Sequence, residues 1–288
     1  MNTLDAIALG LVEGITEYLP VSSTGHLILT ASLLGLDNDP QQKAAVDTFN
    51  IVVQGGAILA VLGLYFSRVM QMCRGLVGKD KAGLKLAINI VVAFLPAAVL
   101  GVLFNEHIER VFFNPTSVLT ALFLGGIWMI WLDAWRKKRP DEKVNRTIDD
   151  LTIPQALGIG LFQCVAMIPG TSRSMMTIAG GTLLGLKPKE AAEFSFLLGL
   201  PTLGGACVYK LVSNVKEANE TEGMEPFYEV LGVTPVLVGI AVATVSAAFA
   251  VKWLVGFLTK HGLAVFGYYR IGLAIVMGAL IYAGVVSL

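Results

Sequence analysis

The sequence predicts an all-α integral membrane protein with six transmembrane helices, two re-entrant helical hairpins and an internal repeat of inverted topology. Three observations predict this fold: a very apolar composition, six apolar stretches long enough to cross a bilayer, and two broken apolar stretches that resemble each other. Of the 288 residues, 55% are hydrophobic and 15% are charged, and the mean hydropathy is +0.71. Average soluble domains have about 25% charged residues, so most of this surface is expected to contact lipid.

Six stretches satisfy the length of about 20 residues that a helix needs to cross the hydrocarbon core. They cover 48–66, 86–104, 117–135, 193–212, 233–251 and 266–288. Two further stretches, 6–36 and 153–186, are interrupted near their middle by proline, glycine and clustered hydroxyl residues. Broken backbone inside a bilayer needs protein or water around it, so we expect each of these two stretches to form a re-entrant hairpin.

The two halves of the chain match at a nearly constant offset. Offsets of 149 and 150 residues superpose Pro20 on Pro169, Ser22 on Ser172, and Leu33-Leu34-Gly35-Leu36 on Leu183-Leu184-Gly185-Leu186. We therefore predict two repeats, residues 1–145 and 146–288, each with one hairpin and three spans. Three spans is an odd number, so the second repeat is inverted, an arrangement typical of a site near the middle of the membrane.

The charges of the connections predict the orientation. The connections 67–85 and 136–150 are rich in lysine and arginine, which marks cytoplasmic loops, whereas 213–230 carries five glutamates against Lys216. Both ends of the chain and the first hairpin then lie on the external side, and the second hairpin enters from the cytoplasm. The net charge of zero excludes nucleic acid as a partner, because binding to phosphates needs a basic surplus.

The first hairpin contains two carboxylates followed by a helix break and hydroxyl groups. Glu13 and Glu17 share one helical face, where like charges in lipid need a cation, a shared proton or water. Pro20 ends the helix, and the run 22–25 (Ser-Ser-Thr-Gly) offers hydroxyls and free amides where the next half-helix begins. Such a helix start binds anions, phosphate above all. The structural alternatives are an ordinary helix cap and a glutamate pair at the interface.

The second hairpin repeats the design with an arginine at its centre. Arg173 is the only charged residue of 153–186 and follows the sequence Ile168-Pro169-Gly170-Thr171-Ser172. A guanidinium binds phosphate through two parallel hydrogen bonds and stays charged at any physiological pH. The alternative is a structural ion pair between Arg173 and Glu13 or Glu17. Arg270 and Lys252 lie near span ends, where a long side chain can reach the interface.

Together the hairpins predict phosphoryl transfer to water. A phosphate monoester or diphosphate needs positive groups on its oxygens, a nucleophile, and a proton donor or metal for the leaving group. The rival hypothesis is a lipid-phosphate transporter or flippase, because inverted repeats with broken helices are also a transporter design. A purely structural membrane protein does not account for a polar cluster so costly in lipid.

The motifs EGITEYLPVSSTGH and PGTSRSMMT resemble the signatures of the undecaprenyl-diphosphate phosphatase family, also called the bacitracin-resistance family. The likeness covers nearly the whole chain. It implies removal of the terminal phosphate of undecaprenyl diphosphate, which returns the lipid carrier for peptidoglycan synthesis. It also implies a polyprenyl diphosphate substrate, a divalent cation (magnesium or calcium), and a site facing the periplasm in the bacterial plasma (inner) membrane. The oligomeric state stays open, a homodimer included.

The resemblance also implies roles for single residues. Glu13 and Glu17 match the acidic pair that binds metal or handles protons, and Arg173 matches the arginine that grips the diphosphate. Ser23 and His26 match the candidate nucleophile and acid–base group. The remaining pocket residues are Ser22, Thr24, Gly25, Ser172, Ser174 and Thr177.

The mechanism expected from these roles starts with Arg173 and the hairpin amides holding the diphosphate, with a divalent cation between it and the two glutamates. Ser23 attacks the terminal phosphorus while His26 or Glu17 takes and returns the proton. A variant of this mechanism makes His26 itself the nucleophile. Met175 departs from the family pattern, since many members have a small residue there, and this concerns the fine shape of the pocket but not its charges.

Overall fold

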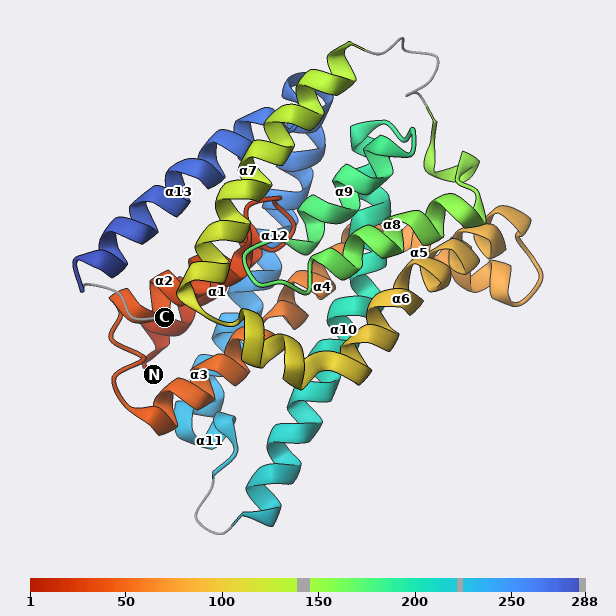
Figure 1. Cartoon of the computed structure of the whole chain (residues 1–288). Helices are drawn as coiled ribbons and strands as arrows, with labels where there is room; N and C mark the ends of the chain where they lie inside the picture. Colours follow the sequence, from red (N-terminus) through yellow and green to blue (C-terminus); the bar gives the residue numbers. More distant parts are fainter. Residues whose placement is uncertain (139–145, 222–224, 285–288) are drawn as a thin grey trace.

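The computed structural model describes residues 1–138, 146–221 and 225–284 (Figure 1). Within these ranges the chain is helical, and its only β-type pairing is one isolated bridge between Arg146 and Leu186. The elements in chain order are α1 Thr3–Thr16, α2 Ser23–Leu33, α3 Pro40–Val52, α4 Gln54–Leu64, α5 Phe66–Leu76, α6 Lys81–Phe112, α7 Pro115–Lys137, η2 Ile148–Asp150, α8 Ile153–Val165, α9 Arg173–Leu183, α10 Pro188–Glu220, α11 Phe227–Leu231, α12 Val233–His261 and α13 Ala264–Tyr282.

Six helical segments of the described chain are long and apolar enough to cross a membrane. They are Pro40–Leu64 (α3 with α4), Lys81–Phe104 of α6, and the whole of α7, α10, α12 and α13. Each overlaps one of the six predicted spans, so the prediction of an all-helical multi-pass membrane protein is confirmed. The last predicted span ran to 288, and its end, 285–288, lies outside the described residues.

The structure adds two features to the prediction. The first span is made of two helices, which meet at Val53. The connection 67–85 holds α5, which packs antiparallel to the start of α6 as a helical hairpin (Figure 1). Gly75 of α5 and Gly83 of α6 permit this approach, because a Cβ at either position would overlap the backbone of the neighbouring helix. A search for long apolar stretches does not detect such a short helix, which has its apolar side chains on one face.

The two broken apolar stretches fold as matching helix pairs. The pair α1 and α2 begins 150 residues before the pair α8 and α9, and each pair is joined by a non-helical turn. Just before α2 and α9, Ser22 and Ser172 have φ angles of 72° and 76°, and no other non-glycine residue in the described ranges has a positive φ. Two independent turns would rarely share this unusual backbone at equivalent positions.

Packing between the halves follows the same correspondence. Helix α1 packs along α12, and α8 packs along α6, while α7 packs against α13 and α4 against α10. Glycines allow the closest approaches: a Cβ at Gly10 would lie 2.5 Å from the carbonyl oxygen of Gly239 in α12. At the equivalent position of α8, Gly160 faces the backbone of Ala93 in α6 in the same way. The first helix of each broken pair is thereby fixed along one face to a long helix of the other half of the chain.

The connections gather at two ends of the molecule. The N-terminus, α11 and the C-terminal end of α13 lie at one end, and the α5–α6 turn and the C-terminal end of α7 lie at the other (Figure 1). Helix α11, from the connection predicted to be external, thus lies with the N-terminus and the end of α13, opposite the α5–α6 turn and the end of α7, which belong to the two basic connections. Several charges used in that prediction fall outside the described residues, namely Arg139, Lys143 and Glu222. So does residue 145, the end of the first predicted repeat.

Candidate functional site

A cavity of about 130 Å³ lies where the turns of the two broken helix pairs meet. Its polar lining comes mainly from the predicted motifs, with one addition from α4. The polar residues are Glu17, Ser22, Ser23, Thr24, Gln54, Ser172 and Arg173, and the others are Ala166, Ile168, Pro169, Gly170 and Leu203. Residues about 150 positions apart in sequence therefore form one site, and its size suits a small anion such as a phosphate group.

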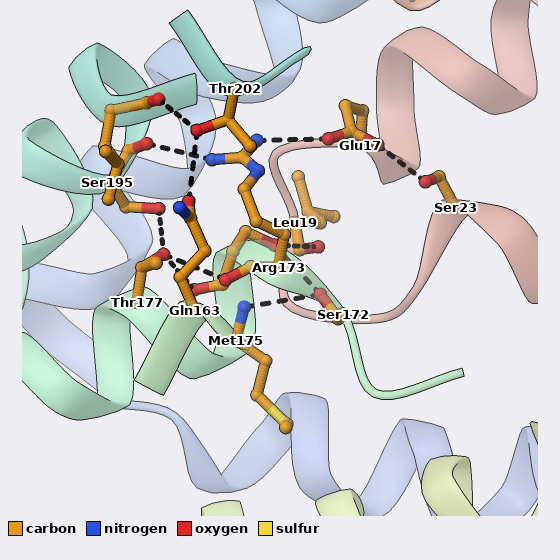
Figure 2. Close-up of polar contacts among 12 residues, drawn as sticks. Glu17, Leu19, Ser23, Gln163, Ser172, Arg173, Met175, Thr177, Ser195 and Thr202 are labelled. Carbon is orange, nitrogen blue, oxygen red and sulfur yellow. Dashed lines mark hydrogen bonds and ion pairs between the residues drawn. The ribbon is translucent and has the colours of Figure 1, made fainter. Parts of the chain in front are cut away.

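A chain of short contacts connects the two turns across this cavity. The hydroxyl of Ser23 donates a 2.6 Å hydrogen bond to Oε2 of Glu17, and Nη2 of Arg173 lies 3.0 Å from Oε1 of the same carboxylate (Figure 2). Glu17 and Arg173 are 7% and 10% exposed, so this ion pair is shielded from water. One carboxylate thus contacts both the candidate nucleophile and the candidate phosphate-binding group.

Local sequence explains why these groups converge. Helix α1 ends at Thr16, and Pro20 lies in the turn that follows it, where the absence of an amide hydrogen prevents the helix from continuing. The positive φ of Ser22 turns the chain so that α2 starts at Ser23, and Ser22 places no side-chain oxygen on the first-turn amides of α2. Ser172 turns the chain into α9 with a similar positive φ, but its hydroxyl oxygen accepts a 3.3 Å hydrogen bond from the amide of Met175 in the first turn of α9. Two helix starts therefore border the cavity, and a helix start favours an anion.

Arg173 is held in place by α10 and the Tyr18 ring, and it keeps one donor, Nε, without a partner among the described residues. Nη1 of Arg173 donates to the carbonyl oxygen of Ser195 in α10 at 2.9 Å, and the guanidinium carbon lies 5.3 Å from the centre of the Tyr18 ring. Its Nε is buried and has no hydrogen-bond partner among the described residues. A buried donor without a partner costs roughly 1–3 kcal/mol, so Nε is suited to receive an oxygen atom of a ligand.

Glu13 lies one helical turn before Glu17 and is fully buried. Neither of its carboxylate oxygens has a hydrogen-bond partner within the described residues. An isolated ionised carboxylate in an apolar interior is very costly, so this group needs a proton or a cation. Carboxylate oxygens are hard donors that suit a divalent ion such as Mg²⁺ or Ca²⁺. The described chain has no cluster of three or more His, Cys, Asp or Glu side chains, so a substrate oxygen would have to complete such a site.

His26 lies in α2 but points away from this cavity. Its Nδ1 donates to the carbonyl oxygen of Ser22 at 2.7 Å, and its Nε2 lies 2.7 Å from the hydroxyl of Tyr269 in α13. Because a carbonyl can only accept, the neutral ring carries its proton on Nδ1 and accepts at Nε2 from Tyr269. The imidazole therefore supports the Ser22 turn and does not contact Ser23.

Five predicted site residues lie outside the cavity lining, namely Glu13, His26, Gly25, Ser174 and Thr177. Ser174 is fully buried and donates to the carbonyl oxygen of Leu19 at 2.9 Å, which ties the two turns together. The Thr177 hydroxyl donates to the backbone carbonyl oxygen of Arg173 at 2.9 Å and contacts the hydroxyl of Ser195 at 2.6 Å. Gly25 faces Leu122 of α7. The structure therefore places Ser174 and Thr177 as supports of the residues that line the cavity, and Gly25 in a packing contact.

The structure corrects the expectation for Arg270. This side chain was expected to reach the interface from a span end, but it is fully buried in α13 and donates to four backbone carbonyl oxygens. The sequence showed its position in a span but not the polar turns of other segments that surround it. Lys252, by contrast, is exposed as expected. Met175 is buried beside Gly125 and does not line the cavity.

Sequence analysis also missed Gln54 and Tyr269. Gln54 starts α4 and, among the described residues, contributes the only polar side chain of the cavity that does not come from a broken stretch. Tyr269 is half-exposed and binds His26 from α13. Neither lies in a motif, and each reaches the site only through the packing of distant spans, so no local pattern could have indicated it.

Comparison with known proteins agrees with this architecture. The family model described as "Bacitracin resistance protein BacA" matches residues 6–276. A protein of Sorangium cellulosum named undecaprenyl-diphosphatase is 44% identical over 273 residues, covering 95% of this chain and 84% of that protein. Undecaprenyl-diphosphatase 1 of Chromobacterium violaceum is 41% identical over 98% of this chain and 97% of its own length. Undecaprenyl-diphosphatase 2 of Rhodospirillum rubrum is 43% identical, with coverage of 99% and 97%. The chain therefore belongs to the BacA family of bacitracin resistance proteins.

Proposed function

We propose that the chain is a membrane phosphatase that hydrolyses undecaprenyl diphosphate to undecaprenyl phosphate and inorganic phosphate. The contact that carries this proposal is the 2.6 Å hydrogen bond from Ser23 to Glu17, a carboxylate that also pairs with Arg173. It combines a nucleophile, a base and an anion-binding group beside one small cavity. The names of the relatives support the substrate, and they do not favour the transporter alternative.

Arg173 and the two helix starts hold the terminal phosphate. The free Nε of Arg173 donates to one phosphate oxygen, and the amides at the starts of α2 and α9 donate to others. An oxygen of the phosphate then competes with Glu17 for Nη2, so substrate binding releases the carboxylate from its cation. That release leaves Oε1 of Glu17 without its positive partner at the moment when Ser23 must lose its proton.

Ser23 then attacks the terminal phosphorus. Its Oγ forms the new bond, its proton passes to Oε2 of Glu17, and the bond from phosphorus to the bridging oxygen breaks, which releases the lipid monophosphate. Water next displaces the serine oxygen from phosphorus, Glu17 returns the proton to Ser23, and phosphate leaves. The geometry favours Glu17 over His26 as the base, because both ring nitrogens of His26 already have partners away from Ser23.

Glu13, with Glu17 beside it, would hold the divalent cation that this chemistry calls for. When bound, the cation neutralises charge on the diphosphate and stabilises the departing lipid phosphate. The support for this part of the proposal is the buried Glu13 carboxylate, whose two oxygens lack hydrogen-bond partners in the described chain.

The proposed setting is the bacterial plasma membrane, with the cavity open to the periplasm. The pairs α1–α2 and α8–α9 are proposed to be re-entrant hairpins from opposite sides, in two inverted repeats. The 150-residue spacing of the pairs and the reciprocal packing of α1 on α12 and α8 on α6 support the repeats. The opposite charge signs of the connections at the two ends support the orientation.

A phosphate-release assay in detergent tests the proposal. Purified protein is mixed with a C15 or C55 prenyl diphosphate, with and without a chelator, and inorganic phosphate is measured over time. We expect release by the native protein, loss with chelator and recovery on adding Mg²⁺ or Ca²⁺. A flippase only moves its substrate across a membrane, so it would release no phosphate in detergent, where no second compartment exists. The absence of phosphate release under every cation condition would therefore contradict the proposal.

A further inference from the structure

We propose that Arg270 is a positioning residue of the phosphate site: its buried guanidinium holds the two cavity turns at a fixed separation. The proposal rests on the proposed phosphatase function, because the turns in question carry Glu17, Ser23 and Arg173. Arg270 itself belongs to α13 and lies in neither broken stretch.

The hydrogen bonds of Arg270 reach both turns at once. Nη1 donates to the carbonyl oxygen of Pro20 at 3.5 Å, and Nη2 donates to that of Gly170 at 2.8 Å. These two carbonyls are 150 residues apart and occupy equivalent places, each two residues before the serine that immediately precedes the next helix. A single planar group therefore bridges corresponding points of the two turns.

The remaining bonds anchor the arginine to a third element. Nη2 also donates to the carbonyl oxygen of Ala121 at 3.0 Å, and Nε donates to that of Leu122 at 3.3 Å, both in α7. Arg270 is 0% exposed and forms no ion pair with a carboxylate in the described part of the chain. A buried cation without a counter-ion is costly, and here its positive charge lies next to Gly170, which lines the cavity. The charge thus adds to the attraction of the site for an anion.

Gly125 of α7 leaves the space that this guanidinium occupies. A Cβ at position 125 would collide with Nη2 of Arg270 and lie 3.0 Å from its central carbon. An alanine there must displace the guanidinium from the turns without altering any charge. Position 125 therefore gives a second, independent way to remove the bridge.

The consequence for activity follows from the geometry. Without the bridge, the turn that carries Ser23 and Glu17 can shift relative to the start of α9, which carries Arg173. A misplacement of about 1 Å between reacting groups can lower a rate about a hundredfold. Lysine keeps the charge, but its ammonium group has three donors on one nitrogen and cannot reproduce the four bonds that Arg270 makes from three separate nitrogens. Lysine should therefore restore only part of the activity.

The test measures kcat and KM for phosphate release from a C15 prenyl diphosphate, together with thermal unfolding in detergent. The variants are Arg270→Met, Arg270→Lys, Arg270→Ala (for rescue by methylguanidinium) and Gly125→Ala. Gly278→Ala is the matched glycine control, because a Cβ there makes an ordinary contact with Leu119 at 3.7 Å in the same helix pair. Lys252→Met is the matched control for loss of a cation, since Lys252 is exposed.

We expect folded Arg270→Met and Gly125→Ala to lose about a hundredfold in kcat per folded molecule, and Arg270→Lys to lose less, with both controls near the native value. Addition of methylguanidinium should restore part of the activity of Arg270→Ala. A kcat of Arg270→Met within twofold of the native value would overturn the inference. A kcat of Arg270→Lys equal to the native value would also overturn it. If the Arg270 variants unfold in detergent, the arginine holds the fold and the inference is also overturned. If the native protein releases no phosphate, the proposed function fails instead.

Discussion

Replacing Glu17 by glutamine separates the two contacts that this carboxylate makes. The amide keeps the size of the side chain and can still accept a hydrogen bond from Ser23, but it cannot take the proton. It also leaves Arg173 without its 3.0 Å counter-ion. If Glu17 is the base, the change removes a general base from the chemical step and frees the arginine for the substrate.

The magnitude follows from these two contacts. Loss of a general base lowers kcat by about 10²- to 10⁴-fold, which corresponds to roughly 3–5 kcal/mol of activation free energy. KM should stay the same or fall, since Arg173 no longer divides its donors between Glu17 and phosphate. Breaking a buried ion pair also destabilises the fold by about 3–5 kcal/mol when one charge is left unpaired. The thermal midpoint in detergent is therefore expected to fall and to recover when phosphate or substrate is added.

The assay is steady-state phosphate release from a C15 prenyl diphosphate at saturating divalent cation. Glu193→Gln is the matched control, because Glu193 pairs with Arg68 at 2.8 Å and does not line the cavity. It should lower the thermal midpoint and leave kcat unchanged. A kcat for Glu17→Gln within threefold of the native value would refute the assignment of Glu17 as base, and a control variant equally impaired would show that kcat reports stability only.

The remaining predictions concern the other groups of the site. Ser23→Ala should lower phosphate release about 10³-fold or more, and near-normal turnover with cation present would end the serine mechanism. Glu13→Gln should not lower thermal stability, because it removes an unpaired buried carboxylate. It should raise the cation concentration needed for half-maximal activity about tenfold or more, and an unchanged cation dependence would exclude Glu13 as a ligand. Tyr269→Phe removes the partner of His26 Nε2 and should change kcat less than about fivefold, whereas a loss as large as that of Ser23→Ala would point to His26 as the reacting group.

The spans and the break points could be predicted because they depend on local properties of the chain. Apolar stretches of sufficient length fix the spans, and the equivalent positions of Ser22 and Ser172 identify the turns. The repeat and the residues of the two turns predicted that the glutamates, the hydroxyls and Arg173 come together, and the resemblance to a known family supplied the roles of single residues such as Ser23. The contacts among these groups required the structure, since the two turns are about 150 residues apart.

The rest of the site depends on how distant spans pack. Arg270 looks like any arginine of a transmembrane helix until the carbonyls of Pro20 and Gly170 are seen around it. The orientation of His26 is set by Tyr269 on α13, so its sequence motif alone suggested a role beside Ser23 that the geometry does not favour. Gln54 enters the cavity only because α3 and α4 form a broken span next to the first turn.

Identification of the covalently labelled residue tests the central claim most directly. The protein is mixed with a prenyl diphosphate that is isotopically labelled at its terminal phosphorus, quenched within one turnover in both acid and alkali, and mapped by mass spectrometry. The account predicts acid-stable label on Ser23 in the native protein and none in Ser23→Ala. Acid-labile label on His26, or full turnover by Ser23→Ala, would contradict it.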